Sequence, residues 1–540
     1  MDRKVISNLG NWHDIRAAFR WNVPEYFNIS ERCCDSWAMA DPDRIAIVHV
    51  EQNGKARNWS YGQLRRASDR LALSFAAQGV TRGDRIAVLL AQSPEVMITH
   101  FAAMKLGVVV LPLFTLFGEE ALRYRLSDSG ARVVVTDVDN LPKILSLNGD
   151  LPDLKVIYST EKSTNPVLDF WSEIEAATGH VAPVKTKADD PAVLIYTSGT
   201  TGPPKGVLHA HRFLIGHLPS IECHHEGFPQ RQDTGWTPAD WAWIGGLMDM
   251  AMPCLYYGVP LISHRMRKFD PAAAYDLIKK HKIRNLFLPP TALKLMRQAP
   301  VPAGVDIRTI SSGGESLGAD LLEWGRANLN APINEIYGQT ECNLVLSSCQ
   351  GLMETRPGSM GLAVPGFEVA IIDAQGNKCP PGEIGEIAVK SPNPVMFLRY
   401  WNLPEQTAEK YLDDWLLTGD LGVCDEDGYF TYSSRGDDVI TSAGYRIGPS
   451  EIENCLMGHG DVVMAAVIGV PDEIRTEVVK AFVVLRDGAD WEGLERQLIT
   501  RVRNNVSPHV APRMIERIDK MPMTATGKIM RRALKDCRQN

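Results

Sequence analysis

The sequence predicts an α/β protein in which a large N-terminal domain of doubly wound α/β subdomains plus a β-rich subdomain precedes a small α+β C-terminal domain. Three observations support this prediction. Helical and strand patterns alternate from residue 60 onward, Gly and Pro become frequent between residues 351 and 385, and the pattern changes again after Arg435. A chain of 540 residues also exceeds what one hydrophobic core supports, so at least two domains are expected.

The first part of the chain alternates helices with strands. Gly107 and Gly130 each follow a predicted helix, where glycine suits the position just beyond the last turn. Such alternation indicates a parallel sheet with helices on both faces. The expected elements are helices over 61–79, 94–106 and 119–129 and strands over 85–90, 108–113 and 132–136.

The same alternation resumes further along and then gives way to strands. The Gly- and Pro-rich stretch with short strands indicates the β-rich subdomain, and the last hundred residues indicate the small α+β domain. The expected elements are a helix over 271–280, strands over 285–288, 309–312, 369–372, 386–389, 462–470 and 478–485, a helix over 491–504 and a strand over 514–518.

Composition excludes several functional classes. A net charge of −8 argues against a nucleic-acid partner. The 10 cysteines show neither zinc spacing nor the density of a disulfide scaffold, and the five histidines between residues 209 and 225 fit no standard zinc pattern. The N-terminus lacks a secretory signal, and no apolar run reaches the roughly 20 residues that a membrane span needs. We therefore expect a cytoplasmic, soluble protein.

The most informative segment is the loop over 196–206, Tyr-Thr-Ser-Gly-Thr-Thr-Gly-Pro-Pro-Lys-Gly. It follows the apolar run 192–196, which predicts a buried strand, so the loop should emerge at a strand end. Hydroxyls, glycines and one cation suit a polyphosphate, because glycines let backbone N–H groups approach phosphate oxygens. Lys205 stands between Pro204 and Gly206, so the loop is not a Walker motif. We infer an ATP site of another architecture.

Three further motifs follow in a fixed order. They are Tyr-Gly-Gln-Thr-Glu over 337–341, the run from Thr418-Gly419-Asp420 through Arg435-Gly436-Asp437 to Gly444-Tyr445-Arg446-Ile447-Gly448, and Thr526-Gly527-Lys528. Together with the loop, they resemble the adenylate-forming superfamily of acyl-CoA synthetases, luciferases and peptide-synthetase adenylation domains, most closely its acetyl-CoA and medium-chain acyl-CoA synthetases. The resemblance covers essentially the whole chain.

The resemblance implies an ATP-dependent, AMP-forming acyl-CoA synthetase that converts a carboxylic acid to an acyl-adenylate and then to a CoA thioester. It implies Mg²⁺ as cofactor and ATP and CoA as co-substrates, with Thr340 at the α-phosphate and Glu341 as the magnesium ligand. The other implied nucleotide-binding residues are Thr197, Ser198, Gly199, Thr200, Thr201 and Lys205 for the phosphates, Gly314, Glu315 and Ser316 for adenine, Tyr337, Gly338 and Gln339 of the second motif, Asp420 and Arg435 for the ribose, and Arg446 for the phosphates.

The C-terminal motifs imply a moving domain. By resemblance, residues 1–434 form the domain that binds ATP and the acyl group, 435–437 with Asp437 form a hinge, and 438–540 form a mobile domain. Lys528 would bridge the carboxylate and the α-phosphate during adenylation. After rotation, Gly444 would leave room for the thiol arm of CoA.

The acyl pocket is predicted from two positions. Trp243 matches a pocket tryptophan of the family, and Ile244 and Leu247 beside it favour an apolar acyl group. Acetyl-CoA synthetases resembling this chain place a tryptophan at the position of Gly338, so we expect glycine to leave the pocket open. The predicted substrate is a medium-chain, branched or aryl acid rather than acetate.

Two alternatives stay open. A stand-alone adenylation enzyme loading an acyl carrier protein would share every ATP motif, although no carrier domain follows Lys528. A silent adenylate sensor is disfavoured because Lys528, Asp420, Glu341 and Arg435 are all present. The sequence is compatible with a homo-oligomer. It also predicts that a lysine acyltransferase or deacylase acting on Lys528 would switch adenylation by changing its charge.

Overall fold

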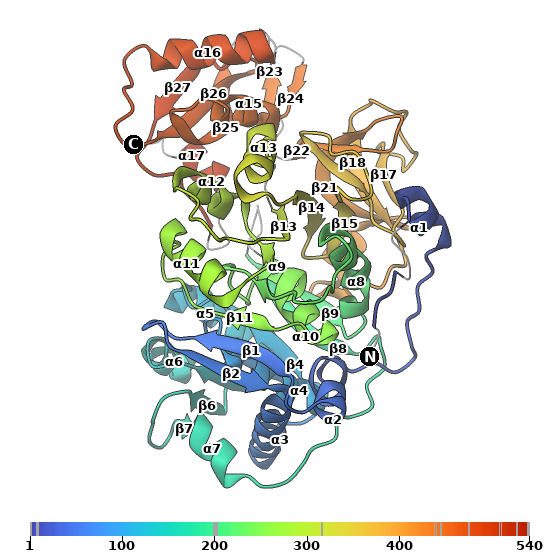
Figure 1. Cartoon of the computed structure of the whole chain (residues 1–540), viewed down its shortest axis with the longest axis vertical. Coiled ribbons are helices and arrows are strands. Elements are labelled where there is room, and N and C mark those ends of the chain that lie inside the picture. The colour runs from blue at the N-terminus through green and yellow to red at the C-terminus, as the bar shows by residue number, and fades with distance from the viewer. Residues whose placement is uncertain are drawn as a thin grey trace.

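The structure, a computed structural model, describes residues 3–6, 10–197, 203–314, 317–436, 438, 440–442, 445–472, 476–506, 508, 510–524 and 528–536. Its described strands form three sheets, and the smallest of them lies at one end of the long axis (Figure 1). The predicted α/β class is confirmed. Both larger sheets are mixed rather than purely parallel: the eight-stranded sheet turns antiparallel toward one edge, and the fourteen-stranded sheet does so toward both.

The eight-stranded sheet contains the alternating first part of the chain. Its strands β8, β4, β3, β5, β6 and β7 pair in parallel, whereas β9 and β19 are antiparallel additions at one edge. The order across the sheet is β19 (Arg399–Tyr400), β9 (Lys205–Ala210), β8 (Pro191–Thr197), β4 (Val109–Pro112), β3 (Arg85–Leu89), β5 (Val133–Thr136), β6 (Val156–Ser159) and β7 (Leu168–Asp169).

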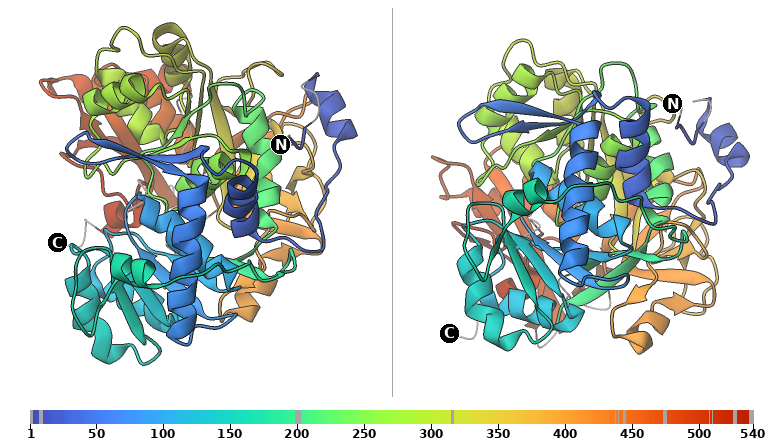
Figure 2. Two further views of the ribbon diagram at one scale, coloured as in Figure 1. Left: turned by 60° about the horizontal axis from the view of Figure 1, so that its bottom comes forward. Right: turned by 90° about the horizontal axis from the view of Figure 1, so that it is seen from below.

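Helices of the same part of the chain lie across these strands (Figure 2). The longest begins at a capping box, in which Ser60 Oγ accepts from Gln63 N at 3.3 Å and Ser60 N donates to Gln63 Oε1 at 2.8 Å. Gly130, at φ +59°, ends the third of these helices as expected. The helices are α3 (Tyr61–Ala77), α4 (Pro94–Lys105), α5 (Glu119–Ser129), α6 (Leu141–Leu147) and α7 (Phe170–Ala176).

The fourteen-stranded sheet joins the second α/β part to the β-rich part. Its strands are parallel from β11 to β14 and antiparallel from β15 onward, so the predicted β-rich subdomain extends the same sheet. The order is β17 (Val369–Ile372), β18 (Gly385–Lys390), β21 (Trp415–Cys424), β22 (Phe430–Arg435), β16 (Ser359–Ala363), β15 (Cys342–Ser347), β14 (Ile333–Gln339), β13 (Thr309–Gly313), β12 (Asn285–Phe287), β10 (Gly235–Trp236), β11 (Leu261–Ser263), β1 (Ile45–Val50) and β2 (Ala56–Ser60), with β20 (Tyr411–Leu412) paired to β21.

Helices connect these strands, and α8, η3 and α10 pack in a core that contains residues of both large sheets. All twelve residues of α8 are buried, as are η3 and α10, so this layer is the centre of the largest hydrophobic core. The helices are α8 (Phe213–His224), α9 (Ile244–Gly246), the π-helix η3 (Leu247–Ala251), α10 (Met252–Tyr257), α11 (Pro271–His281), α12 (Pro290–Gln298), α13 (Ala319–Trp324) and the π-helix η4 (Gly325–Leu329).

The C-terminal domain has its own five-stranded sheet and its own core. The last strand of the large sheet ends at Arg435, and the first strand of the small sheet begins at Ile440. The elements are β23 (Ile440–Ser442), β24 (Tyr445–Ile447), α15 (Pro449–Met457), β25 (Val462–Asp472), β26 (Thr476–Leu485), α16 (Leu494–Asn505), β27 (Met514–Arg517) and α17 (Arg531–Asp536).

Short elements complete the chain outside these layers. They are α1 (Trp12–Ala18), the π-helix η1 (Glu31–Asp35), α2 (Ser36–Ala40), the 3₁₀ helix η2 (Asn148–Asp150) and α14 (Pro404–Ala408).

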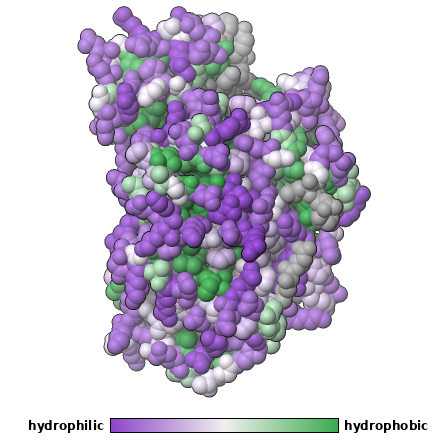
Figure 3. Space-filling model, viewed as in Figure 1, coloured by the Kyte–Doolittle hydropathy of each residue, from purple (hydrophilic) through white to green (hydrophobic). Residues whose placement is uncertain are grey.

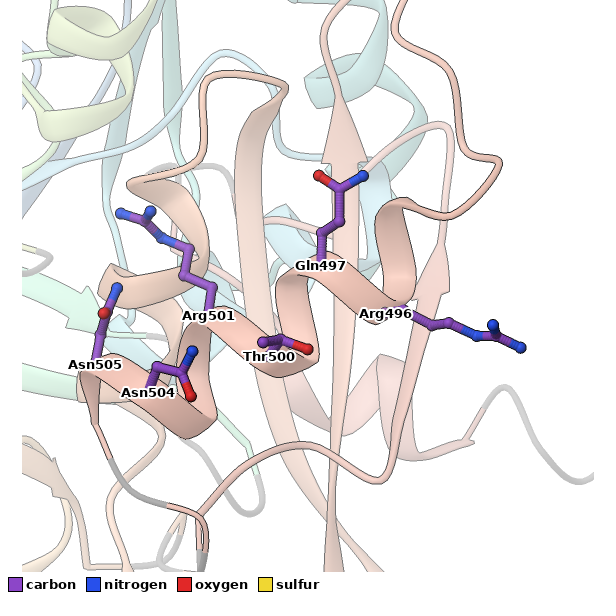
Figure 4. A pocket seen from close by; sticks show the side chains of 6 residues that line it. All are labelled: Arg496, Gln497, Thr500, Arg501, Asn504 and Asn505. Carbon is purple, nitrogen blue, oxygen red and sulfur yellow. The ribbon is translucent and has the colours of Figure 1, made fainter.

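The surface seen in Figure 3 is mostly hydrophilic, with hydrophobic residues gathered in patches near the middle of that face. None of the described helices is both long and apolar enough to cross a membrane. A shallow hollow lies on the exposed side of α16 (Figure 4), lined by Arg496, Gln497, Thr500, Arg501, Asn504 and Asn505.

Candidate active site

The predicted phosphate loop joins β8 to β9. The described register pairs Thr197 with Lys205, so these two residues stand at the two ends of the loop. Thr197 Oγ1 also donates to the carbonyl of Lys205 at 3.4 Å. The strand predicted before the loop is present and buried, as β8. The intervening predicted residues, Ser198, Gly199, Thr200 and Thr201, lie outside the described residues.

The second motif forms a hairpin turn. Tyr337, Gly338 and Gln339 end β14, Cys342 begins β15, and Thr340 and Glu341 form the two-residue turn between them. Both large sheets therefore change from parallel to antiparallel pairing at a predicted nucleotide motif. Because such hairpins project their central residues beyond the sheet, Thr340 and Glu341 are presented together at its end.

A tyrosine links the turn to the phosphate loop. The Tyr400 hydroxyl donates a hydrogen bond to the Glu341 carboxylate, and the ammonium of Lys205 lies 5.0 Å from the centre of the Tyr400 ring. Tyr400 belongs to β19, which pairs with the strand that follows the loop. Glu341 is 9% exposed, so this hydrogen bond fixes a largely buried carboxylate. Tyr400 is in none of the recognised motifs.

The predicted ribose residues face each other across β21 and β22. Asp420 pairs with Arg435 in the register, and the Arg435 Nε atom lies 3.2 Å from Asp420 Oδ1. The Tyr337 hydroxyl donates to Asp420 Oδ2 at 2.7 Å. Among the described residues, none makes a hydrogen bond to Asp420 Oδ1, although that atom is buried. The charge of Arg435 is thus what this oxygen faces, without a hydrogen bond from the described part of the chain that satisfies it.

Lys410 connects the ribose strand to the hairpin. Its ammonium donates to Gln339 Oε1 at 3.0 Å and to the carbonyl of Leu417 at 2.7 Å. Gln339 in turn donates to the carbonyl of Thr418 at 2.9 Å. Lys410 thus holds together two segments that the motifs identify separately. Nothing in its sequence context distinguishes it from a surface lysine.

A glycine turn and a buried glutamate lie at the ends of β13 and β14. Gly314 has φ +98°, a conformation that favours glycine. Glu335 is 4% exposed, and burial raises the pKa of its carboxyl to about 8. Glu335 Oε1 accepts from Leu317 N at 3.4 Å, and no hydrogen bond from a described residue reaches Oε2. Glu315 and Ser316, predicted for adenine, lie outside the described residues.

Trp243 lies where an acyl pocket is expected. It is half-buried, its ring centre is 5.5 Å from that of Phe287, and it borders Gly314. A side chain at Gly245 would meet both rings, at 2.9 Å from Trp243 and 3.0 Å from Phe287. Trp243 and Phe287 therefore form an apolar wall beside the predicted adenine turn.

Gly338 lies where β14 and β15 pack closely. A Cβ atom there would lie 2.8 Å from the Cα of Asn343 and closer still to the backbone nitrogen of Leu344. The direction that a side chain would take is thus filled by the main chain of β15. Glycine suits this position because the two strands approach closely at the hairpin. That Gly338 also leaves the acyl pocket open stays a prediction.

The small domain brings charge to the ribose site. Burial raises the pKa of Asp420, and the positive charges of Arg435 and Lys528 oppose this shift. The side chain of Lys528 is exposed, and its backbone nitrogen donates to Thr524 Oγ1 at 3.1 Å. Arg446 lies in β24, whereas the predicted Gly444 and Asp437 are outside the described residues. The charge of Lys528 therefore reaches the ribose carboxylate.

The five histidines after the phosphate loop are core residues. Burial lowers the pKa of each, to about 3 for His209 and His224 and about 4 for His211 and His217. The structure groups no three His, Cys, Asp or Glu side chains, within its described ranges, that could hold a metal ion. The nine described cysteines are free.

Two family models match the chain. The AMP-binding enzyme model matches residues 34–401, and the AMP-binding enzyme C-terminal domain model matches residues 451–528.

Relatives match over nearly the whole length. The mitochondrial acyl-coenzyme A synthetase ACSM4 of Homo sapiens is 34% identical over 97% of this chain and 93% of the relative. A crystal structure of Brucella canis acyl-CoA synthetase is 32% identical, with a TM-score of 0.76, over 98% of this chain and 99% of that one. The anthranilate CoA ligase AuaEII, solved with anthranoyl-AMP, is 26% identical, with a TM-score of 0.88, over 95% and 98% of the two chains. The chain belongs to the AMP-binding enzyme family, among its acyl-CoA synthetases.

Proposed function

We propose that this chain activates a carboxylic acid with ATP and transfers the acyl group to CoA, releasing AMP and pyrophosphate. One observation carries the proposal. The Asp420 carboxylate accepts from Tyr337, which belongs to the hairpin that presents Thr340 and Glu341, and it pairs with Arg435. The charge of Lys528 acts on the same carboxylate, which supports an adenylation site to which both proposed domains contribute.

The proposed chemistry needs positioning rather than a covalent enzyme intermediate. A carboxylate oxygen attacks the α-phosphorus of ATP, and the bond to the β-phosphate oxygen breaks, which gives the acyl-adenylate. Lys528 would stabilise the negative charge that develops between the carboxylate and the α-phosphate. The thiolate of CoA then attacks the acyl carbon and AMP leaves.

Mg²⁺ fits the residues present. In ATP sites this ion is usually held by one or two carboxylates together with phosphate oxygens and water. Glu341 supplies one carboxylate, and Tyr400 orients it by donating to one of its oxygens. We propose that Glu341 holds Mg²⁺ together with the phosphates, with Thr197 and Lys205 at the phosphate end. The ion would neutralise the departing pyrophosphate.

The second half-reaction requires a different arrangement of the small domain. We propose residues 1–434 and 438–540 as the two units, with 435–437 as the hinge. In the arrangement observed, the charge of Lys528 acts on the ribose carboxylate, which suits adenylation. Rotation would then bring Gly444 to the thiol arm of CoA.

The acid is proposed to be larger than acetate. The apolar wall of Trp243 and Phe287 suits a medium-chain, branched or aryl group. An aryl acid has added support from the similarity to a ligase for anthranilate. A cytoplasmic location and control by acylation of Lys528 stay predictions.

The test is AMP release with Mg-ATP, with and without CoA, across acetate, butyrate, isobutyrate, hexanoate, octanoate, benzoate and phenylacetate. We expect CoA-dependent AMP release with several of the larger acids and little with acetate. Acid-dependent pyrophosphate exchange that CoA cannot discharge would instead favour an enzyme that loads a carrier protein. Absence of both activities would overturn the proposal.

A further inference from the structure

Three buried polar side chains from three different elements meet behind the hairpin. They are His217 of α8, Asp249 of η3 and Asn343 of β15, which are 0%, 3% and 6% exposed. None of them belongs to a recognised motif. Because a core position without a ligand favours apolar residues, a polar cluster there needs its own explanation.

The hydrogen bonds of the cluster have defined directions. His217 Nδ1 lies 2.6 Å from the carbonyl of Phe213, which can only accept, so Nδ1 carries the proton and Nε2 is an acceptor. Asn343 Nδ2 donates to His217 Nε2 at 3.1 Å and to Asp249 Oδ1 at 2.5 Å. Both amide protons of Asn343 are thus used, and its orientation is fixed.

Two polar atoms of the cluster remain open. Across the described part of the chain, nothing donates to Asn343 Oδ1 and nothing bonds to Asp249 Oδ2. Neither atom is among the fully enclosed, unpartnered polar atoms of the described residues. Burial raises the pKa of Asp249 well above its usual range, which favours the neutral carboxyl. Since Oδ1 accepts from Asn343, Oδ2 is the carboxyl oxygen left for a ligand. The cluster therefore offers a ligand the amide oxygen of Asn343 and the second carboxyl oxygen of Asp249.

The cluster lies next to the proposed acyl pocket. The main chain of Asn343 packs against Gly338. Asn343 is two residues beyond Glu341, and two residues of extended chain span roughly 7 Å. Asp249 lies in η3, which continues the helix that begins after Trp243. The third member is on α8, which packs against both β15 and η3. The three elements that carry the cluster thus adjoin the adenylation turn and Trp243.

The backbone is unusual at two of these elements. Asp249 is at the centre of a π-helix, a conformation that often marks functional sites. Leu344, directly after Asn343, has φ +58° although it is neither glycine nor asparagine. Such conformations cost free energy and persist where a side chain must be aimed in a particular direction.

We propose that Asn343 and Asp249, oriented by His217, form a polar subsite at the far end of the acyl pocket that binds a hydroxyl group carried by the carboxylic acid remote from its carboxyl. A hydroxyl matches both open atoms, because it donates to Asn343 Oδ1 and accepts from Asp249 Oδ2. The inference rests on the proposed function and deepens it, since it names the class of acid. Such a site discriminates strongly against the analogue that lacks the hydroxyl, because that analogue leaves buried polar atoms unpaired.

The test compares matched pairs of acids with the full-length protein. The pairs are 4-hydroxybenzoate and 3-hydroxybenzoate against benzoate, and 4-hydroxybutyrate and 6-hydroxyhexanoate against butyrate and hexanoate. We expect at least one hydroxy acid to exceed its parent at least about tenfold in kcat/KM for AMP release. Equal kcat/KM values within every pair, or a higher value for the parent acid in every pair, would by themselves overturn the proposal.

Variants then assign the preference to residues. Asn343→Leu and Asp249→Leu should each reduce the ratio of kcat/KM within the preferred pair toward one. Asp249→Asn should keep most of the ratio, because its amide accepts from Asn343 with the oxygen and donates to the hydroxyl with the nitrogen. Ser220→Ala, a buried change on α8 outside the cluster, serves as the matched control and should keep the ratio. If both leucine variants are folded by thermal melting and retain the wild-type ratio, the subsite assignment is wrong.

The two proposals fail in different ways. If the chain is not a ligase, no acid in either set supports CoA-dependent AMP release. If it is a ligase without the hydroxyl subsite, parent acids are turned over and the hydroxyl confers no advantage.

Discussion

At the scale of single residues, the site depends on side chains that no motif contains. Lys410 and Tyr400 each contact a motif residue, yet they are separated from it by many positions in sequence. The role of Tyr400 follows from strand pairing, because β19 pairs with the strand that follows the phosphate loop. A lysine or tyrosine between motifs gives no local signal of this kind.

Lys410 supplies the first prediction. Replacing it with methionine keeps the length of the side chain and removes its hydrogen bonds to Gln339 and Leu417. Since a hydrogen bond to a charged group contributes about 1.5–3 kcal/mol, kcat/KM for ATP should fall about tenfold or more. The control is Lys378→Met, which removes an exposed ion pair with Glu368 and should leave kcat/KM for ATP unchanged. Wild-type kinetics in Lys410→Met would show that the link is dispensable.

Gly338 supplies the second prediction. Alanine there brings a methyl group against the main chain of β15, so the hairpin must shift. We expect a loss of about 1–3 kcal/mol in the free energy of unfolding, together with lower activity on every acid. Urea unfolding and the acid panel measure the two effects. A stable variant that merely excludes the larger acids would support the view that Gly338 opens the pocket.

At the scale of elements, the sequence predicts most of the regular structure. The helix expected over 119–129 has those bounds, and most other expected elements differ by a few residues at their ends. Local periodicity and capping determine such elements. Pairing across the chain is not local, so the sequence indicates neither the continuity of the fourteen-stranded sheet nor the contact between Gly338 and β15. The acyl pocket was therefore the least predictable part of the site.

Helix α4 provides an element-scale prediction. His100 is fully buried there, and neither ring nitrogen makes a hydrogen bond to a described residue. Burial lowers the pKa of His100 from its usual value to about 3. Below about pH 6.5 the unfolded chain binds a proton at His100, whereas the folded protein does not until the pH nears 3. The free energy of unfolding therefore decreases as the pH falls from about 6.5 toward 3.

The measurement compares His100→Leu with the wild type by urea unfolding at pH 7.5 and pH 5.5. The wild type loses stability as the pH falls from 7.5 to 5.5, whereas the variant lacks the titrating group. The free energy of unfolding of the variant minus that of the wild type should therefore be about 1.4 kcal/mol higher at pH 5.5 than at pH 7.5. A difference that does not depend on pH would mean that His100 titrates normally in the folded state.

At the scale of the whole molecule, the two domains supply different parts of one reaction. The large domain holds the ribose carboxylate and the hairpin, and the small domain carries Lys528, whose charge acts on that carboxylate. The proposed domain motion would present two different groups of the small domain to the same site.

Lys528→Ala and Gly444→Leu should separate the two half-reactions. The first should lower acid-dependent pyrophosphate exchange by about 10²–10³ and spare thioester formation from a supplied acyl-adenylate. The second should leave exchange measurable and block the thioester, because a leucine side chain would fill the path of the thiol. Loss of both half-reactions in both variants would argue for misfolding instead of domain alternation.

The most direct test of the central claim is ATP–pyrophosphate exchange, measured with the wild-type protein and an active acid in the absence of CoA. We predict exchange that requires the acid and Mg²⁺, followed on addition of CoA by equal amounts of AMP and acyl-CoA. Formation of ADP and inorganic phosphate, or exchange that does not require an acid, would contradict the acyl-adenylate mechanism.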